Sequence, residues 1–305
     1  MSEKSGIINI FKPPGITSFG LLSFIKKICK FKKAGHGGIL DFMAQGVLPV
    51  LVGEATKLTS LLFLLPKEYE GEITFGIKTD SDDIWGNIIE KKNSSFINIE
   101  DIENIKNDFV GTINQMPPKF SAKRISGKRA YELAKIGENV ILKEREINIY
   151  QFEILDFIKG DFPKLKFKIL CSSGTYMRSI ARDLGERLDT FGTLSFLVRT
   201  AVGKLEIKDS FHIDDILNNI EKESNFDLII PINEFLDFIP KVTLTSKKLF
   251  LFRTGNIIRY EHPYLKGGFV LILDTSQNAI GIGKYLEEKK ELKPIRILKV
   301  DDIAW

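Results

Sequence analysis

The stretch from residue 35 to residue 49 constrains this chain more than any other part of its sequence. It places one carboxylate, Asp41, among neighbours that are mostly small or apolar, with His36 five residues before it. Glycine lacks a Cβ, so the four glycines of this stretch allow tight turns or a close approach of the backbone to a ligand. Burying a charged group costs several kcal/mol unless it is paired, which favours a chemical role for Asp41. The alternative is a turn in which Asp41 caps a following helix.

The composition is that of a globular protein large enough for two domains. Of the 305 residues, 43% are hydrophobic and 28% are charged, and the net charge of +4 is compatible with a nucleic-acid partner. The 2 cysteines, Cys29 and Cys171, lack metal-ligand spacing, which argues against structural zinc and a disulfide framework. The sequence shows neither a signal peptide nor an apolar stretch of membrane-spanning length, so we expect a cytoplasmic protein with no membrane partner.

Local sequence patterns predict a chain of mixed helices and strands. Thr17 or Ser18 can cap a helix whose apolar residues recur at helical spacing up to Cys29. After Pro240, closely spaced short strands with glycine turns suggest a small barrel or sandwich, so we place a domain boundary near residues 225–240. Further helices are expected at 97–109, 129–137 and 176–188, and strands at 6–11, 69–78, 145–155 and 165–171.

Four separated segments look like parts of one site. They span residues 12–18, 35–57, 115–134 and 171–185. Together, and in this order, they closely resemble the TruB family of tRNA pseudouridine synthases from about residue 6 to about residue 203. A weaker likeness to a PUA domain follows from about residue 240 to residue 305. Four motifs at compatible spacings make a chance likeness improbable.

The resemblance implies an α+β fold in two parts. The catalytic domain, residues 1–235, would have the pseudouridine synthase fold, with a mixed, largely antiparallel central sheet flanked by helices. The second domain, residues 240–305, would be a small PUA-like β-barrel that binds RNA. A purely structural role for the barrel is the alternative.

The resemblance also implies four catalytic residues. Asp41 matches the aspartate nucleophile of the family's glycine-rich loop, and Arg178 matches the arginine of its Gly-Thr-Tyr-x-Arg motif. An arginine fork can hold a carboxylate through two hydrogen bonds and keep it ionised. Tyr69 and Tyr176 match the two site tyrosines, of which one stacks on the extruded uracil and the other assists proton handling. Otherwise both tyrosines are core residues and Arg178 belongs to a surface helix face.

Three further residues are implied to bind the substrate. His36 matches the loop histidine that contacts RNA where the target base leaves its stack, and Leu197 corresponds to an apolar wall of the site. Lys12 is expected to act mainly by supporting the Asp41 loop. The alternatives are that His36 is a loop histidine whose hydrogen bonds are satisfied by its neighbours, and that Lys12 is a solvated lysine in a turn.

The implied reaction is the isomerisation of uridine to pseudouridine at position 55, in the TΨC arm of tRNA, on a flipped-out base. It needs neither a metal nor another cofactor, and attack by Asp41 on sugar C1′ or on base C6 both stay open. We expect a stand-alone monomer that needs no guide RNA and no protein partner. The alternatives are a non-catalytic tRNA-binding or folding module, a carboxylate hydrolase using Asp41 and His36, and a guide-RNA-dependent enzyme.

The chain departs from the family pattern near the nucleophile. Gly37 and Ile39 replace residues that carry hydroxyl groups, and Phe42 replaces a proline. Val198 stands where the family often has arginine. None of these changes touches the expected aspartate, arginine and tyrosines, so they bear on RNA affinity and rate more than on reaction type.

Overall fold

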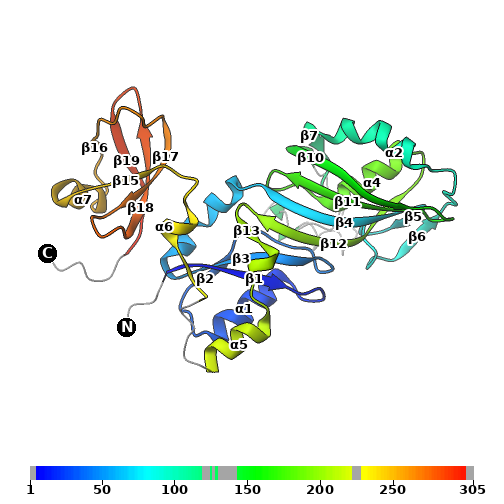
Figure 1. The fold of residues 1–305 in the computed structure, drawn as a ribbon, viewed down its shortest axis with the longest axis horizontal. Helices are drawn as coiled ribbons and strands as arrows, with labels where there is room; N and C mark the ends of the chain where they lie inside the picture. Colours follow the sequence, from blue (N-terminus) through cyan, green and yellow to red (C-terminus); the bar gives the residue numbers. More distant parts are fainter. Residues whose placement is uncertain (1–4, 119–123, 126–127, 130–142, 222–227, 300–305) are drawn as a thin grey trace.

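Two separate β-sheets organise the chain, a ten-stranded main sheet and a five-stranded C-terminal sheet (Figure 1). They are seen in a computed structural model that describes residues 5–118, 124–125, 128–129, 143–221 and 228–299. Within these ranges no helix combines the length and the apolar character that crossing a membrane requires.

The main sheet has the strand order β14-β1-β3-β12-β4-β11-β10-β7, with β2 beside β3 and β13 beside β12. The pair β3–β12 is parallel and the other pairs are antiparallel, so the predicted mixed, largely antiparallel sheet is confirmed. Its strands are β1 (Gly6–Lys12), β2 (Ala34–His36), β3 (Gln45–Val52), β4 (Lys67–Phe75), β7 (Gly111–Gln115), β10 (Arg145–Ile158), β11 (Lys164–Cys171), β12 (Gly192–Val202), β13 (Leu205–Glu206) and β14 (Ile230–Pro231).

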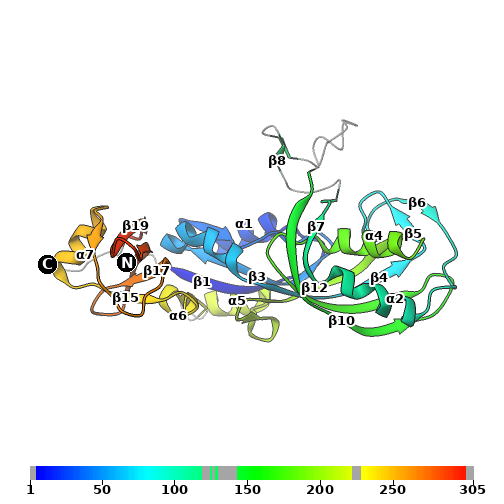
Figure 2. The ribbon, with the colours of Figure 1, turned by 90° about the horizontal axis from the view of Figure 1, so that it is seen from above.

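Helices flank this sheet on both faces. Helices α1 and α5 pack on the face of β1 and β3 that carries Ile8 and Val50, whereas η1 and α6 pack on the face that carries Ile7 and Leu51. Figure 2 shows strand β8, which pairs with β9, standing away from the main sheet. The helices are α1 (Ser18–Ile28), α2 (Ile99–Lys106), α4 (Met177–Arg187), α5 (Ile213–Glu221), α6 (Ile232–Phe235), and the 3₁₀ segments η1 (Gly53–Leu64), η2 (Asn107–Phe109) and η3 (Ile207–Asp209). The hairpins are β5 (Ile77–Thr79) with β6 (Ile88–Lys91), and β8 (Arg124–Ile125) with β9 (Lys128–Arg129).

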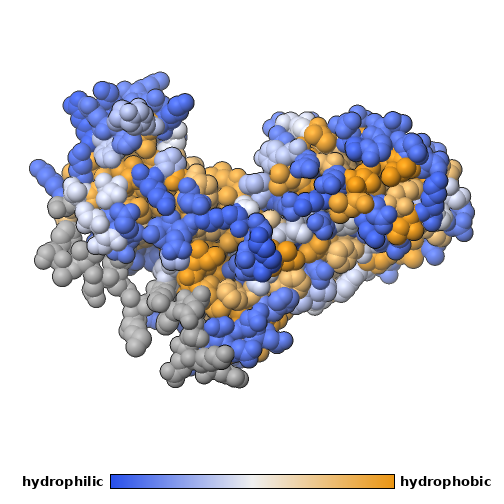
Figure 3. Space-filling model, viewed as in Figure 1, coloured by the Kyte–Doolittle hydropathy of each residue, from blue (hydrophilic) through white to orange (hydrophobic). Residues whose placement is uncertain are grey.

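The C-terminal sheet forms the expected small PUA-like β unit. Its strand order is β15-β17-β18-β19-β16, and its core includes Phe252 of α7, a helix that the sequence patterns did not predict. Leu271 and Leu273 of this sheet pack in one cluster with Ile7 and Leu51 of the main sheet, and hydrophobic residues lie along this junction in Figure 3. The elements are β15 (Lys241–Thr243), α7 (Ser246–Arg253), β16 (Ile258–Arg259), β17 (Gly268–Leu273), β18 (Ala279–Leu286) and β19 (Glu291–Ile297).

Two central strands of the main sheet, β3 and β12, were not predicted. The residues of β3 were interpreted as part of a loop, because a continuous apolar run lacks strand alternation and Pro49 argues against a central strand. Pro49 is tolerated because β2 ends beside it, and its carbonyl accepts a hydrogen bond from Gly37 N at 2.8 Å. The predicted helix at 129–137 falls almost entirely outside the described residues, and Arg129 itself ends strand β9.

Helix α4 lies very close to strand β12 because glycines face each other there. A Cβ on Gly185 would come 2.2 Å from the backbone N of Gly192, and a Cβ on Gly192 would come 1.9 Å from the carbonyl O of Ala181. Backbone atoms cannot yield as a flexible side chain can, so neither position has room for a larger residue. This contact fixes the height of α4, and of its first turn, above the sheet.

We expect Gly185→Ala to destabilise the protein by about 1–3 kcal/mol, since the added methyl overpacks a backbone contact. Gly160→Ala is the matched control, because a Cβ there would meet nothing within 4 Å. Urea unfolding followed by circular dichroism measures both free energies of unfolding. Equal stability of the two variants would contradict the proposed close packing.

Candidate active site

A cavity of about 540 Å³ opens between the segment after β2, strands β4 and β12, and the first turn of α4. This volume lies in the range of roughly 300–1,000 Å³ that is usual for ligand sites. The cavity brings together six of the seven predicted site residues, namely His36, Asp41, Tyr69, Tyr176, Arg178 and Leu197. Segments that are far apart in the sequence therefore meet at one place, as expected.

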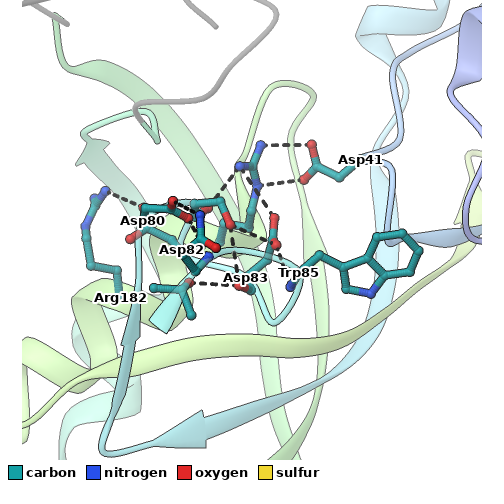
Figure 4. Close-up of polar contacts among 10 residues, drawn as sticks. Asp41, Asp80, Asp82, Asp83, Trp85 and Arg182 are labelled. Carbon is teal, nitrogen blue, oxygen red and sulfur yellow. Dashed lines mark hydrogen bonds and ion pairs between the residues drawn. The ribbon is translucent and has the colours of Figure 1, made fainter. Parts of the chain in front are cut away.

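Asp41 and Arg178 form a two-point ion pair at this cavity. Arg178 donates from Nε to Asp41 Oδ2 and from Nη2 to Asp41 Oδ1, both at 2.9 Å (Figure 4). The Arg178 side chain is only 6% exposed, whereas that of Asp41 is 31% exposed. Because Asp41 is followed by a turn and strand β3, the helix-cap alternative is wrong. The surface-face alternative for Arg178 is wrong as well, and it is Arg187 on the same helix that is exposed, at 60%.

The loop at residues 80–86 completes the surroundings of Arg178. Arg178 Nη1 donates to the Ser81 carbonyl at 3.0 Å and lies 3.7 Å from Asp83 Oδ2. Burial would lower the pKa of Arg178, but Asp41 and Asp83 outweigh burial and raise it, so the guanidinium stays charged. Burial raises the pKa of the Asp83 carboxyl, against the effect of Arg178. Asp83 is not among the residues that line the cavity, and the sequence patterns did not single it out.

The segment that carries Asp41 is held in place from behind. Ser18 Oγ accepts a hydrogen bond from Leu40 N at 2.9 Å, while Thr17 provides the predicted cap of α1 by accepting from Gly20 N. Lys12 Nζ donates to the Ala44 carbonyl at 2.6 Å.

Lys12 itself lies outside the cavity. Its side chain is fully buried, and burial lowers its pKa to about 8 even though Asp41 acts to raise it. The interpretation of Lys12 as a support for the Asp41 loop agrees with this geometry, whereas direct contact with substrate does not. Its ammonium donates to the carbonyls of Pro13 and Ala44, and Lys12 is not among the residues that line the cavity.

Tyr69 and Leu197 form the inner wall of the cavity. They are 8% and 4% exposed, and both come from the adjacent strands β4 and β12. Burial raises the pKa of Tyr69, so its phenol stays protonated at neutral pH. Arg199 pairs with Tyr69 across the two strands, is 1% exposed and donates to the Val47 carbonyl at 2.7 Å. Arg199 was not predicted as a site residue. It lies two residues after Leu197 and shares a sheet face with it, but only if this segment is a strand, and β12 was not predicted.

Tyr176 and His36 stand at other edges of the cavity. Tyr176 precedes α4, and its backbone N donates to Gln115 Oε1 at 2.8 Å while Gln115 Nε2 donates back to the Tyr176 carbonyl at 3.1 Å. The guanidinium of Arg145, a residue that was not predicted, lies 5.9 Å from the centre of the Tyr176 ring. Burial, and then Arg199, lowers the pKa of His36, which favours its neutral form. Within the described residues nothing hydrogen-bonds to its buried Nδ1.

Comparisons with known proteins agree on one family. Residues 26–177 match the model described as "TruB family pseudouridylate synthase (N terminal domain)". A curated "tRNA pseudouridine synthase B" of Caldanaerobacter subterraneus subsp. tengcongensis is 38% identical over 96% of this chain and 98% of its own length. Proteins with the same name from Synechocystis sp. and Bacillus cereus are 39% and 34% identical over 79% and 96% of this chain, and over 81% and 97% of their own lengths.

Solved structures share the fold. "Crystal Structure of a Cbf5-Nop10-Gar1 Complex" contains a chain that is 25% identical, with a TM-score of 0.71 over 97% of this chain and 84% of that chain. "Structure of H/ACA RNP bound to a substrate RNA containing 2'-deoxyuridine" gives a TM-score of 0.73 at 22% identity, over 97% of this chain and 86% of that chain, which shows the fold alone. The predicted pseudouridine synthase fold is confirmed.

The buried position of Lys12 makes stability depend on pH. Because the pKa of Lys12 falls from the ordinary lysine value of 10.5 to about 8 on folding, the unfolded chain binds more protons between these pH values, and stability rises with pH there. Lys12→Met lacks this contribution. We therefore expect the free energy of unfolding of the wild type, relative to that of the variant, to increase from about pH 8 to about pH 10.

Urea unfolding at a series of pH values measures this difference. Lys266→Met, a change at an exposed lysine, is the control and should follow the wild type at every pH. Parallel pH profiles of Lys12→Met and the wild type would contradict the assignment of a buried ammonium at this position.

Proposed function

Because this chain belongs to the TruB family of pseudouridylate synthases, we propose that it isomerises uridine to pseudouridine in tRNA. The relatives named "tRNA pseudouridine synthase B" match almost the whole chain, which supports the activity and tRNA as substrate. The observation that carries the proposal is the two-point ion pair of Asp41 and Arg178 at the edge of a cavity walled by Tyr69 and Leu197.

We propose that Asp41 is the nucleophile of this reaction. A carboxylate held at both oxygens by a buried arginine is oriented for attack. The C1′–N1 bond breaks, the uracil rotates and C5 bonds to C1′, while C5 loses its proton and N1 gains one. The bond that Asp41 forms with C1′ or C6 breaks again before the product leaves, so the atoms of an isomerisation balance. Attack on sugar C1′ and attack on base C6 both fit this arrangement.

The aromatic residues have different proposed roles. Tyr69 is buried with a raised pKa, so it presents a neutral ring and a phenol proton rather than a phenolate base. It is suited to stacking on a flipped uracil, and Leu197 closes the same wall. Tyr176 directly precedes α4 and lines the cavity together with Arg178. We propose that Tyr176 assists proton transfer at the rearranged base. His36 is proposed to contact the RNA near the extruded base.

The proposed target is the uridine at position 55, in the TΨC arm. Flipping a base costs a few kcal/mol, which stacking and phosphate contacts must offset. We propose a catalytic domain of residues 1–235 and a PUA-like RNA-binding domain of residues 240–305, supported by their separate sheets and by a hydrophobic cluster that belongs to the C-terminal unit alone. We also propose that the protein acts as a monomer without guide RNA, a protein partner or a cofactor. A non-catalytic tRNA-binding module remains the alternative.

We expect Asp41→Asn to abolish catalysis. The substrate is an unmodified tRNA transcript with tritium at uridine C5, and released tritium reports the loss of the C5 proton. The rate should fall by at least about a thousandfold, since the nucleophile is lost while the shape is kept. Asp156→Asn, at an exposed carboxylate that pairs with Lys166, should keep the wild-type rate.

A transcript with cytidine at position 55 controls for the target and should release no tritium above background. Release from that transcript would contradict position 55. Release by Asp41→Asn at the wild-type rate would contradict the nucleophile, and no release by the wild-type protein would contradict the activity itself.

Arg178→Lys should lower kcat by about 10²–10³, because lysine cannot hold both carboxylate oxygens. Binding of the transcript should change little, since Arg178 is almost fully buried. Arg187→Lys is the matched control on the same helix and should leave kcat unchanged. Single-turnover tritium release and filter binding separate the two effects, and equal kcat values for both variants would refute the positioning role.

A further inference from the structure

An exposed aromatic pair borders the candidate active site. Phe42 directly follows Asp41, and its ring meets the indole of Trp85 edge to face, with 5.2 Å between ring centres and an interplanar angle of 84°. Phe42 is 49% exposed and Trp85 is 57% exposed, while the neighbouring Ile84 is 41% exposed. Large apolar side chains gathered at one place on a surface usually mark a binding site.

The pair is rigidly connected to the ion pair of the site. Trp85 N donates to Asp83 Oδ1 at 3.0 Å, and the other oxygen of Asp83 lies 3.7 Å from Arg178. The other residue of the pair, Phe42, is anchored through its backbone carbonyl, which accepts a hydrogen bond from Gly15 N at 2.9 Å. In Figure 4 Trp85 lies on the side of this cluster where Asp41 lies, whereas Asp80, Asp82 and Arg182 lie on the other side. The backbones of Phe42 and Trp85 are therefore both anchored next to the ion pair of Asp41 and Arg178.

The charges around the pair indicate what it can bind. The loop that carries Trp85 also carries the carboxylates of Asp80, Asp82 and Asp83. Arg182 and Arg178 pair with Asp82 and Asp83, so the three carboxylates still outnumber the two cations, which disfavours a phosphate group through repulsion. The uncharged face of a nucleobase does not meet that repulsion, and it stacks well on aromatic rings. Phe42 directly follows Asp41 in the sequence, so a base that stacks on this patch would lie close to the proposed nucleophile. This position suits the base of a nucleotide adjacent to the target.

The structure does not need the pair for its core. Both rings are half exposed, so their removal takes little apolar area out of the interior. The motif that this chain otherwise resembles has proline at the position of Phe42, so the aromatic ring is a feature of this chain. These observations favour a role in recognition over one in stability.

We propose that Phe42 and Trp85 form a stacking platform for the unpaired nucleobase adjacent to the target uridine. This inference rests on the proposed function, because it assumes that the target nucleotide enters the cavity beside Asp41. It adds a specificity element outside the cavity, since neither Phe42 nor Trp85 is among the cavity-lining residues.

The first test compares affinities for a TΨC stem–loop RNA whose target uridine is replaced by cytidine. We expect Trp85→Leu to weaken binding by roughly five- to fiftyfold, as loss of one base–aromatic stack would. Trp85→Phe should keep most of the affinity, and Tyr150→Leu, a change at an aromatic residue that is 52% exposed on β10, should keep all of it. Thermal unfolding of each variant checks that the fold is unchanged.

The second test removes the base instead of the ring. A stem–loop with an abasic nucleotide on one side of the target should bind the wild type as weakly as Trp85→Leu binds the intact RNA, with no further loss for the two changes together. The chain has 2 tryptophans, so in Trp305→Phe the fluorescence comes from Trp85 alone. Intact RNA should quench it, and the abasic RNA should quench it much less.

Three outcomes would overturn the platform alone. Additive effects of Trp85→Leu and the abasic nucleotides would show that the ring and the base do not interact. Unchanged RNA affinity together with a loss of dimers in ultracentrifugation would assign the patch to a second copy of the chain. Unchanged affinity and fluorescence, with normal tritium release by the wild type, would remove the platform and leave the proposed function standing. Absence of tritium release by the wild type would instead overturn the proposed function, and the platform with it.

Discussion

The ion pair of Asp41 and Arg178 is the interaction on which the arrangement of the site depends. A buried guanidinium is costly unless its hydrogen bonds are satisfied, and Arg178 meets this demand with both oxygens of Asp41 and the Ser81 carbonyl. Asp83 adds a second negative charge at 3.7 Å. The first turn of α4, the loop at 80–86 and the segment at 37–44 therefore meet at one point, around the Arg178 guanidinium.

The surrounding structure keeps that point rigid. Glycines at the contact between α4 and β12 set the height of the helix, and Lys12 and Ser18 hold the backbone on either side of Asp41. Buried Arg199 ties β12 to the carbonyl of Val47 in β3. These cations face backbone carbonyls, whereas Arg178 faces a carboxylate that is still partly exposed. The result is one accessible, oriented carboxylate in a largely buried positive environment.

The sequence allowed the grouping of the candidate site residues to be predicted better than the strands and loops that position them. The order of the motifs predicted that Asp41 and Arg178 lie in one site, and the two residues form an ion pair there. Apolar residues at helical spacing, with Thr17 as the cap, predicted α1. Strand β3 was missed because a buried central strand is continuously apolar and shows no alternation, and β12 was missed because Ser195, Arg199 and Thr200 interrupt its apolar residues. Arg199 and Asp83 were missed for a related reason, since a buried charge is recognised by its tertiary partners and these lie on strands and loops whose positions the local pattern does not give.

The central claim is that Arg178 presents Asp41 to a flipped-out uridine. The most direct measurement is a crystal structure of the Asp41→Asn protein with a TΨC stem–loop that carries the target uridine. The account predicts a uracil inside the cavity against Tyr69, with the residue 41 side chain about 3–3.5 Å from C1′ or C6 of the target nucleotide. A target base that stays stacked in the RNA loop, or one bound with both carbons out of reach of residue 41, would contradict it.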